Sequence, residues 1–196
     1  MIYIIRHGQT EKNRARTLQG RSDIPLNQEG RKQAAYVRDW FRSENITFDL
    51  AFSSPLGRAV ETAAIVAGDC PIRIDQRLIE MEYGPYEGMD LTAPCPEVKL
   101  FFSDFVHNPA PEGMEPLADV VKRTGSFMEM IRQESKGKNI LVSTHAIAMK
   151  GILENLMPES CGSWWSKYIG NCDVYRTEAD GDHFVCPEKT VTGANV

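Results

Sequence analysis

Three short apolar runs constrain the fold of this 196-residue chain more than any other feature of the sequence. They lie at residues 2–5, 50–52 and 140–142, and each is bounded by polar or turn residues. Short, uninterrupted apolar runs are typical of strands buried on both faces of a parallel sheet. A helical pattern follows each run, so the sequence predicts a three-layer α/β/α sandwich around a mostly parallel sheet.

The expected helices carry apolar residues on one face. After the second run, Ser54 is predicted to cap a helix that begins at Pro55 and stops at Gly68. The other three helical faces are formed by Gly30, Ala34, Val37 and Phe41; by Leu117, Val120, Val121, Thr124, Phe127, Met128 and Ile131; and by Ala148, Ile152, Leu153 and Leu156.

Two regions depart from this alternation within what we expect to be a single domain spanning residues 1–196. Residues 91–116 are irregular and rich in proline, which indicates an insertion that is either a short lid or a plain surface excursion. Near the C-terminus, residues 172–177 and 183–185 flank an Asp-Gly-Asp turn, which predicts a hairpin. Trp164 and Trp165 form an apolar pair that suits either the core or a dimer surface.

Composition narrows the functional classes. The net charge of -5 disfavours broad binding to nucleic acid or to an anionic membrane. The five cysteines include no CxxC pair, and an odd number suits a reducing compartment. We find no apolar stretch of transmembrane length and no signal peptide at Met1, so we expect a cytoplasmic protein.

Polar side chains follow each of the three predicted strands. Arg6 and His7 end the first run, Arg58 opens the helix after the second, and His145 follows the third. The carboxyl ends of parallel strands meet at one edge of a sheet, where ligands bind. Two histidines and two arginines are therefore expected at the same edge.

These residue types suit phosphoryl transfer. Guanidinium groups match the geometry of phosphate oxygens, and a neutral imidazole is a competent nucleophile toward phosphorus. Arginines compensate charge on the transferring group, so no metal or other cofactor is required. A proton donor for the leaving oxygen is available from Glu80 or Glu82. A nearby phosphate dianion would keep either carboxyl protonated by raising its pKa.

Five segments, in chain order, resemble the histidine phosphatase superfamily, which is also called phosphoglycerate-mutase-like. They lie at residues 6–13, 25–34, 53–63, 78–88 and 144–145. The first contains Arg6-His7-Gly8 with Thr10 and Asn13, the third contains Arg58, and the last is Thr144-His145. The resemblance spans nearly the whole chain and implies that family's fold, with residues 91–116 as a short lid insertion.

The resemblance also implies a role for each matched residue. His7 would be phosphorylated transiently, and Arg6, Arg58 and His145 would bind the phosphoryl group with help from Asn13. Glu80 would be the proton donor, since it lies four residues before Gly84, with Glu82 as the fallback. The resemblance places Gln19 and Gly20 in the loop that lines the pocket. Tyr83 either touches the substrate or is a half-buried aromatic residue, and His107 and His183 match no family position.

Two departures from the family bear on the reaction. Ala146 stands where many members have glycine after the second histidine, which adds a methyl group close to the phosphate site. The insertion is shorter than that of the mutases, and residues 91–116 contain Lys99 as their only basic side chain. Water should therefore reach phosphorylated His7, which favours hydrolysis over return transfer.

The sequence leaves several functions to compare. The favoured one is hydrolysis of a phosphomonoester on a small metabolite, and the alternative is a phosphoglycerate mutase. A non-catalytic sensor of phosphorylated ligands is disfavoured, because a binding site does not need the acid Glu80. A metallohydrolase is disfavoured because we find no ligand pair at metal-binding spacing and the arginines would repel a cation.

Overall fold

The computed structural model describes residues 1–193, and six strands form its central sheet in the order β3-β2-β4-β1-β5-β8. In that order the strands are Ile72–Ile74, Leu50–Ser53, Ile140–Thr144, Ile2–Arg6, Val174–Thr177 and Glu188–Val191. The strands from β3 to β1 are parallel, whereas β5 is antiparallel to both β1 and β8. The sheet is therefore mostly parallel, which confirms the prediction.

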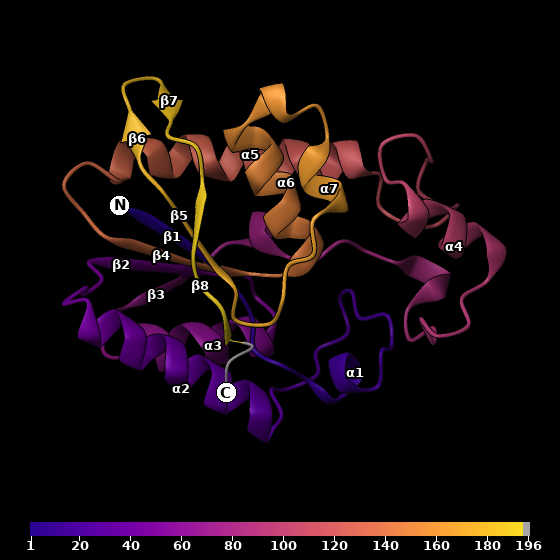
Figure 1. Cartoon of the computed structure of the whole chain (residues 1–196), viewed down its shortest axis with the longest axis horizontal. Coiled ribbons are helices and arrows are strands. Elements are labelled where there is room, and N and C mark those ends of the chain that lie inside the picture. The colour runs from indigo at the N-terminus through magenta and orange to yellow at the C-terminus, as the bar shows by residue number, and fades with distance from the viewer. Residues whose placement is uncertain (194–196) are drawn as a thin grey trace.

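Helices cover both faces of this sheet, as Figure 1 shows. Helices α2 (Gln28–Ser43) and α3 (Gly57–Ala67) lie on one face. On the other face lie α5 (Leu117–Glu134), α6 (Ala146–Leu156) and the short α7 (Ser163–Ser166). The three-layer α/β/α sandwich is confirmed.

Alternation along the strands divides the core between the two faces. In β1, Ile2 and Ile4 pack in the cluster that includes residues of α5 and α6, whereas Tyr3 and Ile5 pack with those of α2 and α3. Successive side chains of a strand point to opposite faces, so one apolar run supplies both cores. This double burial explains why the run is uninterrupted.

The start of α3 differs from the sequence prediction. The helix begins at Gly57 and not at Pro55, and its N-cap is Leu56 without a side-chain hydrogen bond. Ser54 lies three residues before the helix, where its hydroxyl accepts from the Leu56 N–H over 3.3 Å and lies 2.7 Å from Nε2 of His145. The predicted stop is correct, since Gly68 follows the last helical residue with φ of 63°.

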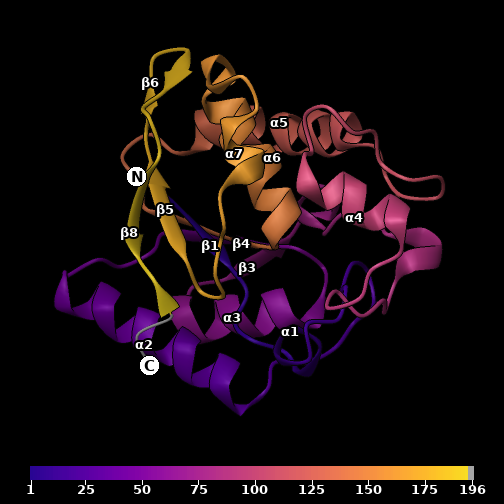
Figure 2. The ribbon, with the colours of Figure 1, turned by 45° about the vertical axis from the view of Figure 1, so that its right-hand side comes forward.

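The insertion contains a helix that the sequence pattern did not predict, α4 (Pro96–Ser103). Figures 1 and 2 place α4 and the short α1 (Glu11–Arg14) together beyond one end of the sheet. The rings of Phe101 and Phe105 in this region pack edge to face with their centroids 4.8 Å apart, and the Phe105 centroid lies 6.1 Å from that of Trp165. The insertion is thus packed against the body. Three short 3-10 helices, Gln76–Leu78, Gly84–Tyr86 and Pro158–Ser160, complete the helical elements of the described chain.

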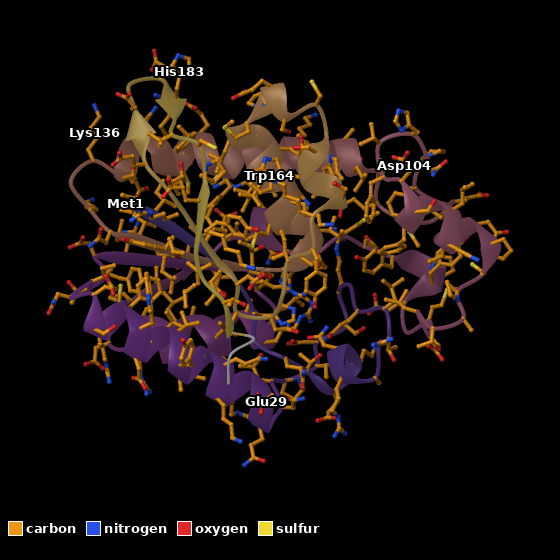
Figure 3. The ribbon with its side chains drawn as sticks, viewed as in Figure 1. Met1, Glu29, Asp104, Lys136, Trp164 and His183 are labelled. Atoms are coloured by element: carbon orange, nitrogen blue, oxygen red, sulfur yellow. The ribbon has the colours of Figure 1, made fainter. Side chains whose placement is uncertain are left out.

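The C-terminal hairpin is smaller than predicted. Its strands are β6 (Ala179–Asp180) and β7 (His183–Phe184), while residues 174–177 pair with β1 and β8 in the main sheet. Trp164 and Trp165 are both buried, so they belong to the core. Figure 3 shows Trp164 among the helices and His183 near the hairpin tip, away from Asp104 of the insertion. Across residues 1–193, none of the helices has the length and apolar character needed to span a membrane.

Candidate active site

The two histidines emerge side by side because their strands are neighbours. Strands β1 and β4 pair in parallel with Arg6 opposite Thr144, and the backbone N–H of His7 donates to the Thr144 carbonyl over 2.9 Å. The imidazole centroids of His7 and His145 lie 5.1 Å apart. The predicted convergence of these residues at one sheet edge is therefore what the structure contains.

His7 is held with one ring nitrogen free. Its Nδ1 lies 2.7 Å from the carbonyl oxygen of Gly8, which can only accept, so Nδ1 carries the proton and Nε2 keeps its lone pair. The Arg58 Nε donates to this Nε2 over 3.2 Å. Burial, followed by the charges of Arg58 and Arg6, lowers the pKa of His7 well below its ordinary value of 6.5. A neutral, oriented imidazole is the form that attacks phosphorus.

Arg58 lies in the first turn of α3 and is fully buried. Its two terminal nitrogens donate to the carbonyl oxygens of Ser22, over 2.7 Å, and Gly20, over 2.6 Å. The loop that carries these carbonyls is fixed in turn by Glu87, whose carboxylate accepts from the Gly20 N–H over 2.9 Å and from the Ser22 hydroxyl. The guanidinium is therefore positioned by neutral carbonyls, and within residues 1–193 no carboxylate forms an ion pair with it.

Three side-chain nitrogen atoms of predicted site residues are buried without a hydrogen-bond partner among the described residues: Arg6 Nε, Gln19 Nε2 and His145 Nδ1. The Ser54 hydroxyl accepts from the Leu56 N–H and donates its own proton to His145 Nε2. The proton of the His145 ring is therefore on Nδ1. Burial, then Arg58, lowers the pKa of His145 well below 6.5, so the ring is neutral. Buried polar groups are rarely left unpaired, and unpaired donors at a functional site indicate a missing acceptor.

Glu80 is buried at the N-terminus of α6. Its carboxylate accepts backbone hydrogen bonds from Met81 over 2.9 Å, from Ala148 over 3.0 Å and from Ile147 over 3.2 Å. The fallback acid, Glu82, is exposed and pairs with Arg21 over 2.6 Å. Of these two carboxylates, only Glu80 lines the cavity beside His7.

That cavity has a volume of about 290 Å³. Its polar end contains the predicted residues Arg6, His7, Asn13, Gln19, Glu80 and Tyr83. Ala146 also lines it and begins a regular helix, so the methyl group is accommodated. Gly20 is not on the wall; its carbonyl lies behind Arg58.

Asn13 and Tyr83 are fixed at the polar end. Asn13 lines the cavity, and its Oδ1 accepts from the Thr10 N–H over 3.1 Å and from Asn171 Nδ2 over 3.2 Å. Tyr83 is buried and not half-buried, and burial together with Glu80 raises the pKa of its phenol well above 10. His107 and His183 are exposed; His107 binds Asp104 over 2.7 Å, and neither lines the cavity.

The sequence analysis missed Lys150. This residue of α6 is 8% exposed and lines the same cavity. Burial lowers the pKa of its amine to about 8. Lys150 lies one helical turn after Ala146, the residue that follows His145. This spacing could have indicated from the sequence that Lys150 lies near the site. No group of three or more His, Cys, Asp or Glu side chains that could hold a metal ion occurs within residues 1–193.

Residues 2–191 match the family profile of the histidine phosphatase superfamily, branch 1. The chain belongs to this superfamily. A relative within the histidine phosphatase superfamily, the probable phosphoglycerate mutase GpmB of Yersinia pestis, is 30% identical over 90% of this chain and 84% of its own.

Solved structures of histidine phosphatases share the fold. Phosphoserine phosphatase from Entamoeba histolytica, in complex with 3-phosphoglyceric acid, superposes with a TM-score of 0.82 at 27% identity and covers 97% of this chain and 96% of its own. YhfR from Bacillus stearothermophilus also has a TM-score of 0.82, with 29% identity and 94% of both chains covered. The predicted family and fold are confirmed.

Proposed function

We propose that this chain is a phosphomonoester hydrolase that acts on a small phosphorylated metabolite through a phosphohistidine intermediate on His7. The superfamily contains both phosphatases and mutases, so its membership supports an enzyme of phosphoryl transfer. The phosphoserine phosphatase of Entamoeba histolytica has been captured with phosphoserine and with 3-phosphoglyceric acid. A substrate of this size fits a cavity of about 290 Å³.

The observation that carries the proposal is the set of unpaired donors around the free nitrogen of His7. Arg6 Nε, Gln19 Nε2 and His145 Nδ1 have no partner among residues 1–193, and Arg58 has no carboxylate partner there. A phosphoryl group supplies acceptor oxygens for the three unpaired nitrogens and negative charge for Arg58. Donors prearranged in this way stabilise the charge that spreads over the equatorial oxygens in the transition state.

In the first half-reaction, the lone pair of His7 Nε2 forms a bond to phosphorus while the bond from phosphorus to the ester oxygen breaks. Glu80, in its protonated form, transfers its proton to the leaving oxygen, which departs as an alcohol. The proton on Nδ1 of His7 stays bound to the Gly8 carbonyl, which holds the ring in line.

In the second half-reaction, the Glu80 carboxylate accepts a proton from water as the water oxygen bonds to phosphorus. The bond from phosphorus to Nε2 breaks, and inorganic phosphate leaves with His7 neutral again. Atoms and charge balance without a metal ion. The two guanidinium groups, which repel a cation, support a metal-independent reaction.

The second candidate is a phosphoglycerate mutase. It is favoured by the 30% identity to the probable phosphoglycerate mutase GpmB. The chemistry on His7 is the same, but a second phosphoglycerate hydroxyl would take the place of water. The short insertion disfavours this reaction, because water should reach phosphorylated His7. Its one lysine, Lys99, is exposed and does not line the cavity.

The test is phosphate release from p-nitrophenyl phosphate and a panel of metabolite phosphates with EDTA present, with His7→Ala alongside. Release by the wild type, lost by at least about a thousandfold in His7→Ala, is the expected result. Interconversion of 2- and 3-phosphoglycerate without release would establish the mutase instead. Release that survives in His7→Ala, or that EDTA abolishes, would overturn the proposal.

A further inference from the structure

We propose that Lys150 makes the enzyme selective for phosphomonoesters whose organic part carries a carboxylate on an apolar or aromatic body. This inference rests on the proposed phosphatase function and names the substrate class of that same cavity. It adds a second anion site at the end of the cavity that lies away from the nucleophile.

Lys150 shares the cavity with the phosphate end but lies farther along α6. The helix begins at Ala146, which follows His145, and Lys150 comes one turn later. Its amine donates to the Trp165 carbonyl of α7 and lies over the Phe105 ring of the insertion, whereas Arg58 donates to His7. Both Lys150 and Arg6 line the cavity. The cavity therefore presents two cationic groups, Arg6 from β1 and Lys150 beside α7 and the insertion.

The charge of the buried Lys150 ammonium group is balanced by few neighbouring groups. Its Nζ donates to the Trp165 carbonyl over 2.6 Å and lies 5.0 Å from the centroid of the Phe105 ring. An ammonium has three donors, and no carboxylate within residues 1–193 forms an ion pair with Lys150. Buried charges are usually paired, because an unpaired one loses its hydration. An incoming carboxylate would supply the missing charge and acceptors.

The rest of the wall at this end is apolar or aromatic. It consists of Leu18, Leu91, Phe102, Phe105 and Tyr168. These side chains come from the α1 loop, from the insertion and from the segment after α7. Apolar walls with a few placed polar groups are the usual form of a small-molecule site, in which the polar groups fix the orientation. A ring or short apolar chain against this wall would place its carboxylate at Lys150.

A purely structural role for Lys150 is the alternative. The bond to the Trp165 carbonyl ties α6 to α7, and the Phe105 contact ties α6 to the insertion. A structural lysine would affect every substrate alike. A selectivity lysine would affect only the charged member of a matched pair of substrates.

The experiment uses 4-carboxyphenyl phosphate and 4-carbamoylphenyl phosphate, which differ in one charge at the end remote from the phosphate. The quantity measured is the ratio of kcat/KM for the carboxylate probe over the carboxamide probe. We expect a ratio of about ten or more for the wild type, a fall to near one in Lys150→Met, and partial recovery in Lys150→Arg. Lys99→Met, which removes an exposed lysine outside the cavity, is the matched control and should keep the wild-type ratio.

A second measurement needs only the wild type, in case Lys150→Met does not fold. Burial lowers the pKa of Lys150 to about 8, with Glu80 raising and Arg6 lowering it further. Ionisations common to both probes cancel in the ratio, and kcat/KM reports the free enzyme. The ratio should stay constant below about pH 7 and fall as the pH rises through about 8. The other titratable groups on this cavity and the adjoining surface are His7, Tyr83, Tyr168, Asp104 and Lys167.

The outcomes separate the two proposals. A wild-type ratio near one, a ratio that does not change with pH, or a folded Lys150→Met protein that keeps the wild-type ratio would overturn the role of Lys150 while leaving the phosphatase in place. Absence of phosphate release from both probes and from p-nitrophenyl phosphate would overturn the phosphatase itself, and this inference with it.

Discussion

The Nε of Arg58 lies 3.2 Å from Nε2 of His7, so a permanent cation faces the ring nitrogen that is free to act as a nucleophile. A phosphoryl group that bonds to this nitrogen would meet the guanidinium immediately. The same cation opposes protonation of His7, and it contributes to the lowered pKa of the ring. In the proposed mechanism, Arg58 would therefore keep His7 neutral and also compensate the charge of the transferred group.

Replacement of Arg58 by lysine should lower kcat/KM for any phosphomonoester by about a hundredfold or more. Lysine keeps the charge but lacks the planar fork that bonds Ser22, Gly20 and His7 at the same time. Steady-state kinetics, with inorganic phosphate as a competitive inhibitor, would show weaker inhibition as well. Wild-type kinetics in Arg58→Lys would show that geometry at this position is unimportant.

The proton donor is tested by Glu80→Gln with Glu82→Gln as its matched control. On an alkyl phosphate, Glu80→Gln should lower kcat about 10²–10⁴-fold, because the leaving alkoxide must be protonated. On p-nitrophenyl phosphate the loss should be much smaller, since that leaving group is a weak base. Glu82 is exposed and paired with Arg21, so its substitution should leave both rates close to those of the wild type. Equal losses on both esters for Glu80→Gln would contradict its role as an acid.

The buried histidines should make the folded state sensitive to acid. Burial lowers the pKa of both His7 and His145 well below 6.5, whereas the unfolded chain binds these protons near 6.5. The unfolded state therefore holds more protons below that pH, and the free energy of unfolding falls as the pH drops through about 6.5. The loss is at most about 1.4 kcal/mol per pH unit for each histidine.

Urea denaturation at pH 7.5 and pH 5.5 checks this expectation. The double variant His7→Gln, His145→Gln should lose less stability than the wild type between the two pH values. An identical loss in both proteins would assign the acid sensitivity to other groups.

Close backbone packing behind the nucleophile predicts a stability effect at Gly30. A Cβ atom on Gly30 of α2 would overlap the backbone oxygen of Gln9, two residues after His7. Gly30→Ala should therefore lower the free energy of unfolding by about 1–3 kcal/mol, with a loss of activity. Gly57→Ala is the control, because its Cβ would meet only the Asp23 side chain, at 3.3 Å. Thermal unfolding of the two variants would contradict the prediction if their midpoints were equal.

The sheet and the residues at its edge were predictable because each depends on local sequence. Apolar runs define β1, β2 and β4, and parallel pairing alone brings His7 and His145 together. The N-cap at Ser54 was wrong because the chain stays extended through Leu56, and the Ser54 hydroxyl lies 2.7 Å from Nε2 of His145, 91 residues away. Local capping rules do not include such long-range partners.

Two other features depend on tertiary contacts in the same way. Helix α4 is short, begins at a proline and lacks a capping side chain, so its signals were weak beside the surrounding prolines. In the sequence, Lys150 has the features of an ordinary helical lysine. Its buried environment depends on the Trp165 carbonyl and the Phe105 ring, which come from other segments. The residues proposed to bind the phosphoryl group can thus be recognised in the sequence, whereas those that line the rest of the cavity cannot.

The two ends of the cavity differ in how freely they can change during evolution. The phosphate end is built from strand ends and helix starts, where a substitution disturbs the core. The opposite wall comes from Leu91, Phe102, Phe105 and Tyr168, of which Tyr168 is 83% exposed. Tyr168 can change at little cost in stability, whereas Phe102 and Phe105 stack on each other and on neighbouring rings. Gene duplicates of this chain should accordingly vary first at Tyr168 and at Leu91, which is 37% exposed.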